Sequence, residues 1–145
     1  MSARLVYRIA AVLLVLFAVG HTLGFSEADP KWGVDALLAS LRSTPFDADG
    51  FRRTWWDFYL ATGYIAGLFY LFAAVLAWQL GGLPGAALAR LRAATWGFAL
   101  CFAAITAVSW LHLFLIPLAF SAVITVTLAL AAGLSAKAPA SEPAE

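Results

Sequence analysis

The sequence predicts an all-α fold: an integral membrane, up-down four-helix bundle with a short amphipathic helix in its first, outer loop. The 145 residues are 63% hydrophobic and only 12% charged, whereas a soluble domain carries about 25% charged residues. A soluble chain of this size could not bury so much apolar surface. The stretch Ala93–Leu134 contains 42 consecutive residues without a formal charge. As one helix it would be about 63 Å long, twice the ~30 Å hydrocarbon core of a bilayer, so it must cross, turn and cross back.

The composition also excludes several classes of function. The formal net charge is +1, so the chain has no basic field and nucleic acid is not an expected partner. Cys101 is the only cysteine. It excludes an internal disulfide, a CxxC redox pair and a cysteine-built zinc or iron–sulfur site within one chain. The lipid bilayer is the first partner that the sequence predicts.

The first helix is expected over about residues 4–25. Arg4 and Arg8 precede an apolar run, a pattern that resembles a signal peptide. We expect the segment to be retained as a membrane span, with Arg8 snorkelling to the near interface. Gly20 and Gly24 form a GxxxG pair near its end, which lets another helix backbone approach closely.

The outer loop is the long polar connection over residues 26–54. Within it, Val34–Leu41 places three leucines on one helical stripe: Leu37, Leu38 and Leu41. This spacing predicts a short amphipathic helix that lies on the membrane surface or caps the bundle. A turn is expected where Asp47, Asp49 and Gly50 precede the second span.

The second helix is expected over about residues 54–80. Thr54 and Asp57 have the spacing of a capping box, which accounts for a carboxylate at this position. Gly63 and Gly67 form a second GxxxG pair, and we expect this pair to contact the first helix.

The remaining spans are expected over about residues 86–112 and 117–134. Breaking and polar residues place the turn between them at about residues 112–116. The four helices define a transmembrane domain over residues 1–136, and the composition of residues 137–145, rich in Ala, Pro and Glu, predicts a disordered tail.

The basic residues give a weak bias for the orientation in the membrane. One side has five of them, namely Arg4, Arg8, Arg90, Arg92 and Lys137, and the other has four, namely Lys31, Arg42, Arg52 and Arg53. Because the side richer in Lys and Arg is usually cytoplasmic, both termini are expected in the cytoplasm.

The polar side chains gather at the outer ends of the predicted spans. His21 ends the first helix, His112 ends the third, and the second begins near Asp57, Tyr59 and Arg53. These residues predict a small ligand pocket that opens outward. The alternative is that polar and aromatic groups collect at any membrane interface, where His21 would bond a neighbouring helix or water and Asp57 would only cap its helix.

Two kinds of bound group would suit the histidines. His21 and His112 could ligate a b-type haem on both axial positions. Together with Asp57 they could form a three-ligand metal site with an open position. The sequence contains no other motif for binding haem or a metal, so no cofactor is expected.

Two short motifs resemble a family of small bacterial four-span membrane proteins without assigned activity, which is loosely similar to the DoxX-like group. They are His21-Thr22-Leu23-Gly24-Phe25 and Arg53-Thr54-Trp55-Trp56-Asp57-Phe58-Tyr59. The resemblance implies a bundle in a bacterial inner membrane. It also implies a signature made of His21, Arg53, Trp56, Asp57 and Tyr59. DoxX relatives have been connected with redox and sulfur metabolism, but the lone cysteine provides no thiol pair for such chemistry.

Taken together, these features favour a non-enzymatic bundle that binds a small lipophilic molecule or a membrane-protein partner near the outer face. The ligand-binding residues would be His21, Arg53, Trp56, Asp57, Tyr59 and His112. The alternative is a membrane oxidoreductase that uses haem, a metal or quinone near His21 and His112. A purely architectural homo-oligomer is a third hypothesis.

Overall fold

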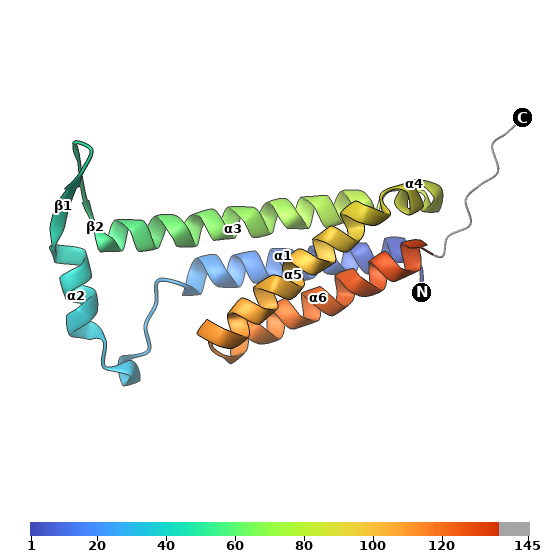
Figure 1. The fold of residues 1–145 in the computed structure, drawn as a ribbon. Helices are drawn as coiled ribbons and strands as arrows, with labels where there is room; N and C mark the ends of the chain where they lie inside the picture. Colours follow the sequence, from blue (N-terminus) through green and yellow to red (C-terminus); the bar gives the residue numbers. More distant parts are fainter. Residues whose placement is uncertain (137–145) are drawn as a thin grey trace, which may run out of the picture. The chain divides into compact units, whose positions relative to one another are not determined.

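The computed structural model describes residues 1–136 (Figure 1). In chain order the elements are α1 (Ala3–Gly24), the 3-10 helix η1 (Pro30–Trp32), α2 (Asp35–Ser43), β1 (Pro45–Ala48), β2 (Phe51–Thr54), α3 (Trp55–Leu80), α4 (Gly85–Arg90), α5 (Arg92–His112) and α6 (Leu115–Ala136). The predicted all-α helical bundle is confirmed. Of these helices, α1, α3, α5 and α6 are each long and apolar enough to cross a membrane, so the chain is a multi-pass membrane protein. The tail expected over residues 137–145 lies outside the described residues.

The helix boundaries differ from expectation in two places. The single helix expected over residues 86–112 is two helices, α4 and α5, separated at Leu91. The Leu91 amide contacts the carbonyls of both Ala87 and Leu88, a shared bond typical of a helix end. The last span begins at Leu115 rather than at residue 117, because Pro117 falls in the first turn, where its missing N–H leaves no hydrogen bond unmade.

The chain divides into two compact units, and the first contains residues 1–17 and 71–136 of the described chain. Figure 1 shows α5 and α6 side by side in this unit. Their hydroxyls meet where the Oγ1 atoms of Thr106 and Thr125 lie 3.0 Å apart. The centre of the unit is apolar and fully buried, with Tyr7 and Leu14 from α1, Ala77 from α3, and Ile124 and Leu128 from α6. Both small and large side chains are buried there, as close helix packing allows.

The second unit, residues 18–70, contains the end of α1, the outer loop and the beginning of α3. The expected amphipathic helix is present as α2. The structure adds a hairpin in which β1 pairs antiparallel with β2, with Ala48 opposite Phe51. Asp49 and Gly50 connect the strands, both with positive φ, 54° and 85°. An Asp-Gly pair with this backbone is the preferred two-residue hairpin loop, and Asp47 Oδ1 accepts the Gly50 amide 2.9 Å away.

Candidate functional site

His21 is held inside the second unit by its neighbours on α1 and α3. Its Nε2 lies 3.0 Å from the backbone oxygen of Gly63. A carbonyl oxygen can only accept, so Nε2 carries the proton. The imidazole stacks on the Phe25 ring at 5.3 Å between centroids and meets the Tyr70 ring edge-on at 5.5 Å. His21 is thus a half-buried side chain bonded to a neighbouring helix, which is the alternative that the sequence offered to a ligand-binding role.

The end of α1 fits against α3 because two glycines leave room for it. A Cβ at Gly63 would overlap the Phe25 ring, and a Cβ at Gly67 would lie 2.6 Å from Thr22 Oγ1. The expected contact between this glycine pair and the first helix is therefore present. The other pair differs, because a Cβ at Gly20 or Gly24 would meet nothing within 4 Å.

Asp57 caps α3, as the spacing predicted. Its Oδ2 accepts the Thr54 amide at 2.7 Å and the Thr54 hydroxyl at 2.9 Å. The Asp57 amide in turn lies 3.2 Å from Thr54 Oγ1, which completes the capping box. Arg53 is also exposed; it donates to the backbone oxygen of Arg52 and lies over the Phe51 ring. Both charged members of the predicted site thus contact their own neighbours in sequence.

Trp56 and Tyr59 occupy a different place, since both line a groove of about 200 Å³ formed within the second unit. The Tyr59 hydroxyl donates to the backbone oxygen of Phe25. The Trp56 ring lies 5.3 Å from the Tyr59 ring and carries the Arg42 guanidinium 4.2 Å from its centroid. The rest of the lining comes from the segment that follows α1 and from α2: Ser26, Glu27, Ala28, Trp32, Val34, Leu37, Leu38 and Leu41.

The lining of this groove explains how the outer loop folds. The three leucines that the sequence placed on one stripe of α2 all face the groove. The hairpin is anchored beside it, because the Phe46 ring lies 5.5 Å from Trp55 and 5.6 Å from Phe58, at the start of α3. The groove is therefore built from one amphipathic helix, one loop and the first turns of one membrane span.

His112 belongs to the first unit, where it is the exposed last residue of α5. Within neither unit do three His, Cys, Asp or Glu side chains of residues 1–136 come together as metal ligands would. Of the predicted site residues, the structure brings together Trp56 and Tyr59 in the groove. His21 is connected to Tyr59 only through Phe25: the imidazole stacks on the Phe25 ring, and the Phe25 carbonyl accepts a hydrogen bond from the Tyr59 hydroxyl.

Four contributors to this region were not expected from the sequence: Arg42, Trp32, Glu27 and the hairpin. In the sequence, Arg42 contributes only to the charge bias that orients the chain in the membrane. An Arg on the last turn of an amphipathic helix can, however, also reach an aromatic ring. Trp32 and Glu27 lie in a stretch without periodicity, so no sequence signal marked them as groove residues. The hairpin had a signal, because Asp49-Gly50 is the strongest short hairpin motif.

The comparisons with known proteins add no relative: no protein-family model, curated protein or solved structure matches this chain.

Proposed function

We propose that this membrane protein binds a small lipophilic molecule in the groove between α2 and the first turns of α3. The observation that carries the proposal is the lining of the groove, which three leucines of α2 share with Trp56 and Tyr59. Its volume of about 200 Å³ equals roughly seven water molecules. Because pockets for drug-sized molecules begin at about 300 Å³, we expect a slim chain, or the end of one, rather than a bulky ring system.

The charge of the groove indicates the chemical class of the ligand. Among the lining residues, all of them in the described part of the chain, Glu27 is the one with a formal charge. The exposed Glu27 carboxylate and the Arg42 guanidinium over Trp56 bring opposite charges to this region, so neither an anionic head group, such as that of a fatty acid, nor a cationic one is favoured. The groove therefore favours an uncharged lipophilic molecule with an alcohol or similar polar end.

The aromatic wall is fixed before a ligand arrives. Arg42 lies over Trp56, and the Tyr59 hydroxyl is held by a backbone carbonyl. Side chains that are already ordered lose little entropy on binding, so a small contact area can still give useful affinity. His21 supports this wall from behind, through the Phe25 ring and backbone.

The oxidoreductase alternative gains no specific support. The His21 Nε2–H is directed at Gly63 O, which leaves Nδ1 as the nitrogen that could ligate, but no three His, Cys, Asp or Glu side chains of residues 1–136 come together as metal ligands would. Asp57, the third proposed ligand, accepts two hydrogen bonds from Thr54. A membrane-protein partner remains an alternative occupant of the groove, and the experiment below distinguishes it.

We further propose a bacterial inner membrane as the location, with both termini in the cytoplasm and a DoxX-like relationship. The two motifs support the family and the membrane, and the excess of Arg and Lys on the terminal side supports the orientation. A maleimide that cannot cross membranes tests the orientation in a Cys101→Ser background. Asp49→Cys should be labelled on intact cells and Ser2→Cys only after permeabilisation. The reverse pattern would overturn the proposed orientation.

The ligand proposal is tested with a diazirine-bearing hexadecanol added to membranes that contain the full chain. After photolysis, peptide mass spectrometry should find the label enriched in residues 26–41 and 55–59. Leu41→Glu, which places a charge in the groove, should lose most of that label. The matched control is Ala39→Glu, which adds the same charge at an exposed position of the same helix outside the groove lining.

The outcomes separate the alternatives. The corresponding diazirine fatty acid should label the groove less than the alcohol does. Label spread evenly over the four spans, or unchanged in Leu41→Glu, would contradict a lipophilic ligand in the groove. A groove that excludes the alcohol but cross-links to a second protein in native membranes would favour the partner instead.

A further inference from the structure

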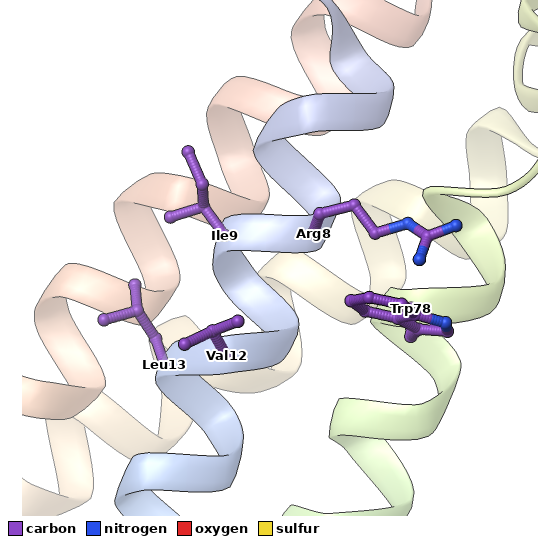
Figure 2. Close-up of a pocket in the computed structure, with 5 residues that line it drawn as sticks. All are labelled: Arg8, Ile9, Val12, Leu13 and Trp78. Carbon is purple, nitrogen blue, oxygen red and sulfur yellow. The ribbon is translucent and has the colours of Figure 1, made fainter.

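Arg8, near the beginning of the membrane-spanning helix α1, contacts an aromatic ring of α3. Its guanidinium carbon lies 3.6 Å from the centroid of the Trp78 ring. Figure 2 shows the side chain extending from α1 toward α3, with the guanidinium over the indole. Arg8 is half-buried, and residues 1–136 offer it neither a hydrogen bond nor an ion pair for its side-chain donors. Its five N–H groups are therefore available to an acceptor from outside the chain.

The backbone near Arg8 holds the side chain in this position. A Cβ at Gly81 would lie 3.0 Å from Arg8 Nε and 3.1 Å from the backbone oxygen of Arg4. The turn after α3 therefore approaches α1 closely because Gly81 has no side chain. Trp78 and Gly81 together fix where the guanidinium lies, at the end of α3.

The described residues of the first unit provide no carboxylate side chain to neutralise Arg8. These residues, 1–17 and 71–136, contain no Asp or Glu, but they contain four arginines: Arg4, Arg8, Arg90 and Arg92. Arg4 and Arg8 are also one helical turn apart, a spacing at which like charges repel. An anion bound between or beside them would relieve this repulsion.

The surface beside Arg8 is apolar. A groove of about 280 Å³ is lined by Arg8 and Trp78 together with Ile9, Val12 and Leu13. In Figure 2, Ile9 and Leu13 project from the side of α1 away from Trp78. Ile9 and Val12 are exposed, by 42% and 53%, on a helix that is apolar enough to lie in lipid. A cation and an apolar strip next to each other match a phosphate and an acyl chain.

We propose that Arg8 and Trp78 form a binding site for an anionic phospholipid, with the lipid phosphate on the guanidinium and an acyl chain along Ile9, Val12 and Leu13. Guanidinium groups bind phosphate oxygens through paired hydrogen bonds. The Trp78 ring holds the guanidinium at the interface while leaving its N–H edge free. This site is separate from the groove of the proposed function and does not depend on it.

Native mass spectrometry of the full chain in detergent tests the proposal. Phosphatidylglycerol and phosphatidylcholine with identical acyl chains are titrated separately. The wild-type protein should bind its first molecule of phosphatidylglycerol more tightly than its first molecule of phosphatidylcholine. Arg8→Gln should weaken that binding about five-fold, the expected effect of one basic residue near an anionic lipid. Arg90→Gln removes the same charge from an exposed position on α4 outside the groove lining, so its binding should stay close to wild type.

Two further variants keep the test informative. Arg8→Lys keeps the charge but not the planar, stacked guanidinium, and should give an intermediate loss. Trp78→Leu should also weaken binding, because the guanidinium would lose its support. Equal losses of affinity for phosphatidylglycerol in Arg8→Gln and Arg90→Gln would overturn the proposal. So would equal binding of the two lipids, or complete displacement of the lipid by inorganic phosphate.

Discussion

Gly63→Ala tests whether the end of α1 and the start of α3 fit together as the structure shows. The added methyl group would overlap the Phe25 ring. That ring cannot move away freely, because it also contacts His21 at 5.3 Å, Tyr59 at 5.7 Å and Tyr64 at 5.2 Å between centroids. The methyl group must therefore displace either the aromatic cluster or the helix end.

The magnitude follows from two opposing effects. Alanine in place of glycine favours a helix by about 1 kcal/mol, whereas overpacking costs about 1–3 kcal/mol. Gly63→Ala should therefore lower the free energy of unfolding by up to roughly 2 kcal/mol. Gly20→Ala is the matched control, because a Cβ there meets nothing within 4 Å. It should be neutral or stabilising by up to about 1 kcal/mol.

The assay is reversible unfolding of the full chain by SDS in mixed micelles, followed by far-ultraviolet circular dichroism. A double-mutant cycle with Phe25→Ala isolates the contact, since Gly63→Ala should cost little once the ring is absent. Stability of Gly63→Ala equal to that of Gly20→Ala, with no coupling to Phe25→Ala, would refute the packing described here.

Three further predictions concern single polar groups, all measured by the same unfolding assay. Asp57→Ala removes the capping box and should lower the free energy of unfolding by about 1 kcal/mol, while hexadecanol labelling of the groove stays unchanged. Lost labelling would instead place Asp57 in the binding site. His21→Ala removes the hydrogen bond to Gly63 O and should lower the free energy of unfolding by roughly 1 kcal/mol. Hexadecanol labelling should weaken less than it does in Leu41→Glu. An equal or larger loss of label would mean that His21 contacts the ligand. Tyr7→Phe should be close to neutral in its free energy of unfolding, because the buried Tyr7 hydroxyl lies beside the hydroxyls of Ser135 and Thr95 without a hydrogen bond of good geometry to residues 1–136. A loss above about 1 kcal/mol would show that one of these hydroxyls is a true partner.

The membrane-spanning helices were predictable because long apolar runs without charge are a strong sequence signal. A charge-free apolar run longer than one bilayer crossing admits few arrangements, and the observed turn between His112 and Leu115 agrees with the expected one to within a few residues. The cap at Thr54 and Asp57 was predictable for a similar reason, since the reciprocal bonds involve only local backbone.

The break at Leu91 was not predictable in this way. Neither glycine nor proline interrupts residues 86–112 at that point; the separation accompanies the complete burial of Leu88 in the first unit. Tertiary packing rather than local preference therefore decides where α4 ends. The hairpin, by contrast, could have been inferred from Asp49-Gly50, but the flanking strands are short and mostly exposed, and so lack a clear alternation.

The candidate site was predicted only in part. Composition placed Trp56, Asp57, Tyr59 and His21 at one end of the bundle, but membrane-interface aromatic residues and caps occur there in any such protein. Which of them face a groove depends on how α2 folds back over the start of α3. That arrangement depends on long-range contacts, such as Arg42 on Trp56, which no spacing in the sequence encodes.

The most direct test of the central claim is an experimental structure of the full chain in a lipid environment, with the groove between α2 and α3 well defined. We predict slim, non-protein density that contacts Leu37, Leu41 and Trp56. A groove closed by the protein's own side chains, with α2 packed directly against Trp56 and Tyr59, would contradict it.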